Sequence, residues 1–195
     1  MNIWTRLARK TAPGATPVTL DEAKAQCRVS FSDEDAFITS LIERAVATID
    51  GPRGIGVCMV TQAWVLSLDA FPTCVALPMG PMKGVDAVKY VDADGVEQTL
   101  APTEYLVDTG GEVARISPAY GKTWPPTRSQ YGAVSVEFTA GTSPESVNPS
   151  LKAAVLLMVG HWYQNREAVS GDASFAELPL GVRSILDQFR VGTAA

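Results

Sequence analysis

Apolar residues recur every three or four positions in the first third of the chain, which is the period of a helix buried on one side. Thr19 and Glu22 have the spacing of a capping box, so a first helix is expected there. A second helix is expected to open at Ser32, with the acids of 33–35 beside the positive end of its dipole. Its buried face is predicted to consist of Ile38, Leu41, Ile42, Ala45, Val46 and Ile49.

The period changes to two between about residues 57 and 140, which is the alternation of strands with one buried face. QAWVLSL at 62–68 and GAVSVEF at 132–138 alternate most regularly. VDAVKYV and VEQTL flank the turn sequence DADG, so they predict a β-hairpin. With EYLV and VARI following, we expect an antiparallel β-region of five or six strands.

Helical periodicity returns near the C-terminus. Asn148 is a favourable N-cap, and Pro149 suits the first position of a helix. The apolar positions of this helix are Leu151, Val155, Met158 and Trp162. A last short helix is expected from about 180 to 190, and its buried face is predicted to consist of Val182, Ile185, Leu186 and Phe189.

Helices at both ends with strands between them indicate that the terminal segments meet and that the β-region is an insertion. The predicted fold class is therefore α+β, with a small helical bundle formed by N- and C-terminal helices and an inserted antiparallel β-region. The expected domains are a flexible N-terminal arm at 1–17, a first part of the bundle at 18–56, the β-region at 57–140, and a second part of the bundle with a C-terminal docking tail at 141–195.

The N-terminal arm carries three basic residues and no acid before it breaks at the prolines and glycine of 13–17. We expect it to be solvated in the free chain and to order on a partner. Three apolar residues that would share one helical face are its predicted docking residues, Ile3, Trp4 and Leu7.

Composition limits the partners. The 195 residues are 46% hydrophobic and 19% charged, which is typical of a globular protein. No apolar run approaches the roughly 18 residues of a membrane-spanning helix, so no membrane partner and a cytoplasmic location are expected. The net charge of -5 disfavours gripping a nucleic acid, which needs clustered lysine and arginine. An acidic wall would let DNA slide past.

The chain offers few residues for catalysis. His161 is the only histidine, and the three cysteines Cys27, Cys58 and Cys74 are widely spaced. A zinc site would need a second nearby histidine or a cysteine pair, and no phosphate-binding loop or nucleophile elbow occurs in the sequence. We therefore expect no enzyme, no metal and no cofactor, and we interpret His161 as a hydrogen-bonded helix residue.

Two alternatives stay open from these residues. One is a Cys/His-dependent hydrolase in which Cys58 or Cys74 meets His161 in space. The other is a small regulatory DNA-associated module, which the negative charge disfavours.

Five stretches together resemble the head-tail connector, or adaptor, proteins of tailed bacteriophages and of phage-like gene transfer agents. In chain order they are PVTLDEAKAQCRV, SDEDAFITSLIERA, TQAWVLSLDAFP, VSVEFTAG and LPLGVRSILDQFRV. The resemblance spans nearly the whole chain from about residue 17. Its most specific parts are the closing LPxGVxxxLxxFR pattern and the QxWxLxLDxFP stretch.

The resemblance implies a non-enzymatic ring subunit, commonly in twelve copies, in the neck of a virion or phage-like particle assembled in the bacterial cytoplasm. Its implied partners are other copies of itself, the portal protein, and a stopper or terminator protein on the tail side, with DNA passing through the channel unbound. On this basis the turn of Asp92, Asp94 and Gly95 is predicted to face the tail side. Packing on the portal or between subunits is predicted for Leu180, Val182, Ile185, Phe189 and Arg190.

Overall fold

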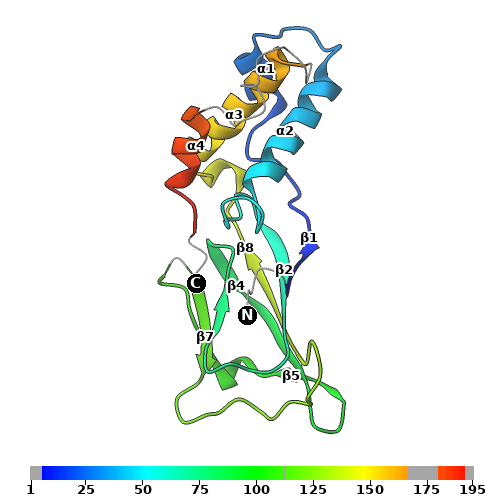
Figure 1. Cartoon of the computed structure of the whole chain (residues 1–195), viewed down its shortest axis with the longest axis vertical. Coiled ribbons are helices and arrows are strands. Elements are labelled where there is room, and N and C mark those ends of the chain that lie inside the picture. Colours follow the sequence, from blue (N-terminus) through cyan, green and yellow to red (C-terminus); the bar gives the residue numbers. More distant parts are fainter. Residues whose placement is uncertain (1–5, 112, 167–179, 192–195) are drawn as a thin grey trace. The chain divides into compact units, whose positions relative to one another are not determined.

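The computed structural model describes residues 6–111, 113–166 and 180–191 of the chain (Figure 1). It divides into two compact units. One holds Met1–Gly14 and Thr61–Thr142, and the other holds Ala15–Val60 and Ser143–Ala195. Strands build the first unit and helices build the second. The predicted α+β fold, in which an antiparallel β-region is inserted between N- and C-terminal helices, is therefore confirmed.

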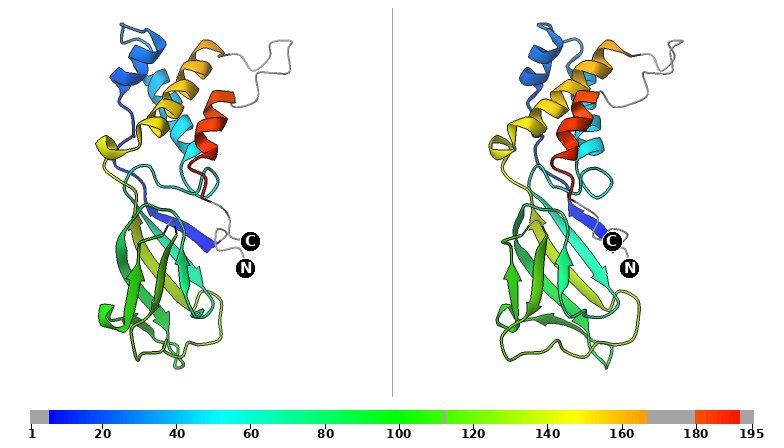
Figure 2. Two further views of the ribbon diagram at one scale, coloured as in Figure 1. Left: turned by 90° about the vertical axis from the view of Figure 1, so that its left-hand side faces the viewer. Right: turned by 60° about the vertical axis from the view of Figure 1, so that its left-hand side comes forward.

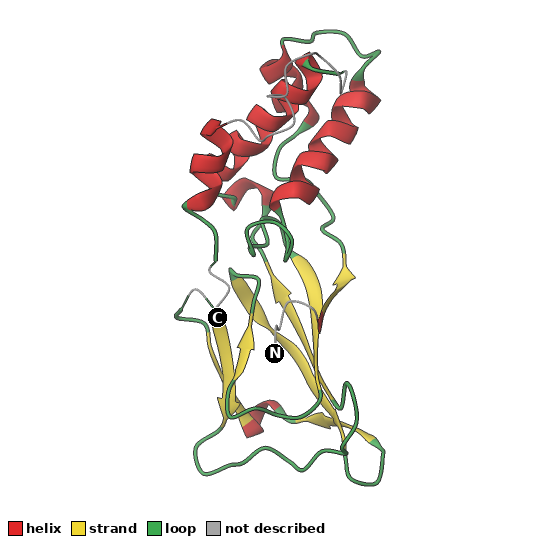
Figure 3. Cartoon of the chain, in the orientation of Figure 1, coloured by secondary structure: helices red, strands yellow, loops and turns green. Residues whose placement is uncertain are grey.

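The described part of the helical unit contains the helices α1 (Leu20–Cys27), α2 (Asp35–Ile49), α3 (Pro149–Gln164) and α4 (Leu180–Asp187), and the 3-10 turn Pro144–Ser146 (Figure 3). The predicted capping box starts α1: the Thr19 hydroxyl accepts a hydrogen bond from the Glu22 backbone N–H at 3.1 Å, and the Glu22 carboxylate accepts one from the Thr19 N–H at 2.6 Å. At the start of α3, the Asn148 side chain accepts one from the Ser150 N–H at 2.9 Å. None of the helices described here is long and apolar enough to cross a membrane.

The start of α2 differs from the prediction. The helix begins at Asp35, after a turn in which the Ser32 carbonyl accepts a hydrogen bond from the Asp35 N–H at 3.1 Å. Glu34 occupies the N-cap position, but its side chain caps nothing. The reason is that its carboxylate is bound by Tyr163, in the last turn of α3, and by Arg166, just after that helix. A tertiary contact therefore replaces the local capping expected of Ser32.

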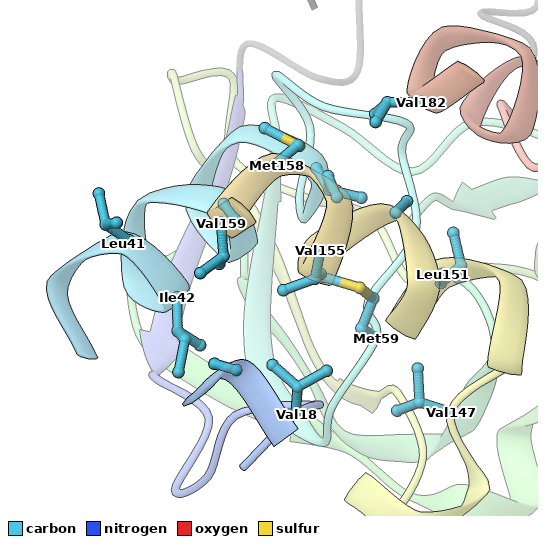
Figure 4. Packing of buried hydrophobic residues seen from close by; sticks show 14 of the residues in the cluster. Val18, Leu41, Ile42, Met59, Val147, Leu151, Val155, Met158, Val159 and Val182 are labelled. Carbon is cyan, nitrogen blue, oxygen red and sulfur yellow. The ribbon is translucent and has the colours of Figure 1, made fainter. Parts of the chain in front are cut away.

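The core of the helical unit lies between α2 and α3, with contributions from α1, α4 and the segment before the first β-strand of the insertion (Figure 4). Met158 and Val155 of α3 are completely buried there, as is Val182 of α4. Most of the residues predicted to form the buried faces of the helices belong to this cluster. Its buried members are Val18, Ala23, Ile38, Leu41, Ile42, Ala45, Ile49, Ile55, Met59, Val60, Val147, Leu151, Ala154, Val155, Met158, Val159, Val182 and Leu186.

The β unit contains two antiparallel sheets (Figure 2). The five-stranded sheet has the spatial order β1 (Leu7–Thr11), β2 (Gln62–Leu68), β8 (Val134–Ala140), β4 (Met82–Val91) and β5 (Glu97–Leu100). The three-stranded sheet has the order β3 (Val75–Leu77), β7 (Ala114–Pro118) and β6 (Tyr105–Asp108), with the 3-10 turn Pro102–Glu104 before β6. The predicted hairpin is the β4–β5 pair.

Alternation along β2 and β8 sets the core of the β unit. Both strands alternate between buried and half-buried positions over seven residues. Their register places Trp64 opposite Phe138 and Leu66 opposite Val136, so the buried positions of both strands face the same side. Phe138 is the largest completely buried side chain of the unit.

The expected flexible arm is corrected in part by the structure. Residues 7–11 form the edge strand β1, with Leu7 opposite Leu66, so Leu7 does not lie on a helix. Ionic contacts hold this strand in place: Arg6 pairs with Asp69 at 2.5 Å, and Lys10 pairs with Glu137. These partners are more than 60 residues away in sequence, so no local pattern indicates the pairing. The predicted docking residues Ile3 and Trp4 lie outside the described residues.

Candidate functional site

The tip of the β4–β5 hairpin is organised by one carboxylate. Asp92 accepts hydrogen bonds at Oδ1 from the backbone N–H groups of Asp94 and Val96, at 3.1 and 2.9 Å, and at Oδ2 from the Gln98 amide at 2.9 Å. These hydrogen bonds, with the Gln98 contact largest, lower the pKa of Asp92. Gly95 has a φ of 89°, which favours glycine. Asp92 therefore shapes the turn, while Asp94 and Gly95 are exposed at its tip.

The packing residues predicted in and just after the C-terminal helix α4 lie in two different environments. Val182 is completely buried in the core of its own unit, and Ile185 and Phe189 are half-buried against that core. Arg190 is exposed and lies 3.6 Å from the Asp187 carboxylate. Leu180 begins the helix, but its side chain lies outside what the structure describes. Val182 is thus occupied within its own chain. Arg190, which follows α4, also donates a hydrogen bond to the Gly54 carbonyl at 3.5 Å, and it is the exposed charged residue of the set.

A cluster that the sequence patterns did not reveal joins the start of α2 to the end of α3. The Tyr163 hydroxyl donates to Oε2 of Glu34, and Nη2 of Arg166 donates to Oε1 at 2.6 Å. The Arg166 guanidinium also lies 4.8 Å from the Phe37 ring centroid and 4.7 Å from that of Tyr163. Cation–π contact and ion pairing therefore act on the same guanidinium. The cluster fixes the point at which the chain leaves α3.

The contacts within this cluster shift the pKa values of its members. The hydrogen bond from Tyr163, followed by that from Arg166, lowers the pKa of Glu34. The same contact with the Glu34 carboxylate raises the pKa of Tyr163, because an ionised phenol would face a negative charge. At neutral pH, the stable state is an ionised glutamate, a neutral tyrosine and a charged arginine. This arrangement provides rigidity and no group poised to exchange a proton near neutral pH.

Replacing Glu34 by glutamine should make the helical unit less stable at neutral pH and reduce the acid sensitivity of its unfolding. A carboxylate with a lowered pKa in the folded state stabilises that state fully above the ordinary glutamate pKa, and the contribution disappears as the pH falls through the lower folded pKa. Urea unfolding of both proteins at neutral and acid pH measures the difference. The exposed neighbour Asp33→Asn is the matched control. Equal stability gaps at both pH values would contradict the prediction.

His161 lies in the last turn of α3, half-buried, and its carbonyl accepts hydrogen bonds from Asn165. Of the thiols, Cys58 is buried and Cys74 is exposed. Burial, followed by the nearby Glu34 carboxylate, raises the pKa of Cys27, so its thiol stays protonated at neutral pH. Among the described residues, no group of three or more histidine, cysteine, aspartate or glutamate side chains is placed to hold a metal ion.

The surface of the β unit carries several exposed apolar side chains. Tyr120 and Tyr131, in the segment between β7 and β8, are 101% and 88% exposed, and Leu106 on the edge strand β6 is 57% exposed. Phe71 stacks on Trp124 with ring centroids 4.5 Å apart, which attaches the same segment to the unit. Exposed aromatic residues on an ordered segment are typical of contact surfaces, so this segment is a candidate surface for binding a macromolecule.

The model of the family described as phage gp6-like head-tail connector protein matches residues 17–65 and 127–190, more than half of the chain. No curated protein matches.

Solved structures match over almost the entire chain. A chain from the neck of an empty GTA particle, computed with C6 symmetry, is 26% identical, covers 95% of both chains and has a TM-score of 0.76. A chain from the virion of a native gene transfer agent (GTA) particle is also 26% identical, with 95% coverage of both chains and a TM-score of 0.75. A third, from the neck of a native GTA particle computed with C12 symmetry, is 23% identical over the same coverage, with a TM-score of 0.67, and supports the fold alone.

Proposed function

Because this chain belongs to the phage gp6-like head-tail connector family, we propose that its copies form a ring in the neck of a phage or gene transfer agent particle. Its role is that of a structural connector. The proposal that the copies form a ring is supported by one observation. This chain is 26% identical, over 95% of both chains, to a chain from a particle neck with six-fold symmetry. Six-fold symmetry accommodates twelve copies, the number that the resemblance implies.

The ring joins the portal protein on one side to a stopper or terminator protein on the other. On the portal side, the proposed contacts are Leu180 and the half-buried Ile185 of α4, together with the half-buried Phe189 and the exposed Arg190, which follow that helix. On the tail side, the proposed contacts are Asp94 and Gly95, held at the tip of a hairpin that Asp92 makes rigid. The arm residues Ile3, Trp4 and Leu7 complete the predicted docking set.

DNA passes through the ring without specific binding. This is supported by the net charge of -5, because a protein that grips the phosphate backbone gathers lysine and arginine on one surface. Assembly takes place in the bacterial cytoplasm before the particle is released. The connector acts without catalysis, and neither the hydrolase nor the regulatory DNA-associated module gains support from the family or from the thiols described above.

Electron microscopy of purified particles that contain this chain tests the proposal directly. We expect a ring at the neck, with twelve copies of the chain between the portal and the first tail-side protein. The matched control is a set of particles produced without the gene for this chain, whose density should lack that ring. Mature particles whose necks contain no copy of the chain would contradict the proposal.

A further inference from the structure

The two edges of the five-stranded sheet carry opposite charge. At one edge, β1 and the residue before it contain Arg6, Arg9 and Lys10 and no acid. At the other, β5 and the turn that leads into it contain Asp92, Asp94 and Glu97 and no base. Both are edge strands, with one partner each among the described strands: β1 pairs with β2 and β5 pairs with β4. Each therefore presents a row of backbone hydrogen-bonding groups on its outer side.

Two of the three basic side chains at the β1 edge already form ion pairs within the chain. Arg6 and Lys10 form ion pairs with Asp69 and Glu137, although Lys10 remains 51% exposed. Arg9 is exposed, with its guanidinium 5.6 Å from the Trp64 ring centroid. Its contact with an aromatic ring leaves its positive charge unneutralised. The basic edge therefore keeps Arg9 for an incoming partner, whereas Lys10 is already paired with Glu137.

The acidic edge keeps two carboxylates. The carboxylate of Asp92 accepts hydrogen bonds within the turn. Asp94 and Glu97 are exposed, and neither forms an ion pair among the described residues. One basic side chain approaches the turn, since Arg128 lies over Gly95, where an added Cβ would be 2.3 Å from its Nη1. Arg128 belongs to the segment between β7 and β8, and β5 itself contains Glu97 and no base.

A closed ring requires two different surfaces on each subunit that fit each other, because each copy contacts its two neighbours head to tail. Opposite edges of one sheet satisfy this requirement, and their opposite net charges disfavour contact between two like edges. We infer that β1 of one copy pairs with β5 of the adjacent copy, so that the five-stranded sheet continues from subunit to subunit. This inference rests on the ring proposed above and names the surface that joins its subunits.

The sheet also fixes the direction of the junction. Each of the four neighbouring pairs from β1 to β5 is antiparallel, so β1 and β5 run in the same direction within a subunit. Subunits related by a small rotation about the ring axis keep that direction. The junction is therefore parallel, unlike the strand pairs within the sheet.

The register identifies side chains that would meet across the junction. From the β1 edge, Ala8 is opposite Val65 of β2, and Val65 is opposite Glu137 of β8. From the β5 edge, Thr99 is opposite Lys89 of β4, and Lys89 is opposite Ser135 of β8. Ser135 and Glu137 are two residues apart on β8, so they share the half-buried outer face of that strand. Ala8, Glu97 and Thr99 therefore lie on one face of the sheet, whereas Gln98 lies on the other.

Disulfide trapping in assembled particles tests the junction. In a Cys27→Ser, Cys74→Ser background, Ala8→Cys is combined with Glu97→Cys or with Thr99→Cys, because both positions of β5 lie on the same face of the sheet as residue 8 and are two residues apart. After mild oxidation, a non-reducing gel should show a ladder of covalent oligomers up to the complete ring for at least one combination. The single variants, and Ala8→Cys with Gln98→Cys on the opposite face, should stay monomeric.

Microscopy of the same particles separates the two possible failures. A ring at the neck together with monomeric chains for both same-face combinations would overturn the edge pairing and leave the connector function intact. Equal ladders for the Gln98→Cys control would also overturn it, because the junction would then have no defined face. Necks that contain no ring would overturn the proposed function and the pairing with it.

Discussion

Replacing Phe138 by alanine should lower the free energy of unfolding of the β unit by about 3–5 kcal/mol, the range for truncating a buried aromatic side chain. Phe138 is completely buried and lies on β8, with β2 on one side and β4 on the other. It is opposite Trp64 and Val85 in the two neighbouring strands. Removing the ring leaves a cavity that neither flanking strand can fill without breaking its ladder of backbone hydrogen bonds.

Urea unfolding of the full chain, followed by the fluorescence of the tryptophans in the β unit, measures this effect. Ser135→Ala is the matched control, because Ser135 lies on the same strand with its side chain on the half-buried outer face. That substitution should change stability by less than about 0.5 kcal/mol. Similar losses for the two variants would contradict the assignment of Phe138 to the core.

Elements with a strong local pattern could be predicted from the sequence. β2 and β8 were predicted because each alternates over seven residues, and the β4–β5 hairpin because DADG has the residues that its turn requires. The start of α1 was predicted because both partners in its capping box are three residues apart. In each case the interaction that defines the element lies within a few residues in sequence.

Elements defined by distant partners could not be predicted in the same way. β1 has the composition of a solvated basic arm, and only its pairing with β2 and its ion pairs make it a strand. The three-residue strand β3 is too short to show a period. Glu34 is 129 residues from Tyr163, so its local sequence indicates only a favourable interaction with the helix dipole. Long-range pairing overrode local preference in all three cases.

The predicted site residues also differ in whether their role depends on distant partners. A helical stripe predicts which residues of a helix are apolar, but it does not distinguish a residue that faces its own core from one that faces another protein. Val182 and Arg190 were therefore predicted together as contacts, and the structure separates them. The same limit applies to Asp92 and Asp94, which share a turn but not a role.

Replacing Val182 by aspartate should destabilise the helical unit by about 3–5 kcal/mol, because it places an unpaired charge in an apolar core. Val182 is completely buried in the core of the helical unit, where α4 packs against α3. α4 is only eight residues long, and a helix of that length is not stable on its own in water. Its structure therefore depends on the burial of Val182 and Leu186, so the substitution should release the whole helix.

Hydrogen exchange of the α4 backbone amides and urea unfolding of the full chain measure this loss together. Ser184→Asp adds the same charge to the exposed side of the same helix and should leave both measurements nearly unchanged. Arg190→Ala, at an exposed position, should also preserve stability, so that any loss of neck assembly in that variant reports a lost partner contact. If Val182→Asp were as stable as Ser184→Asp, Val182 would be free of its own core, and its predicted packing against the portal or a neighbouring subunit would become the better explanation of its apolar character.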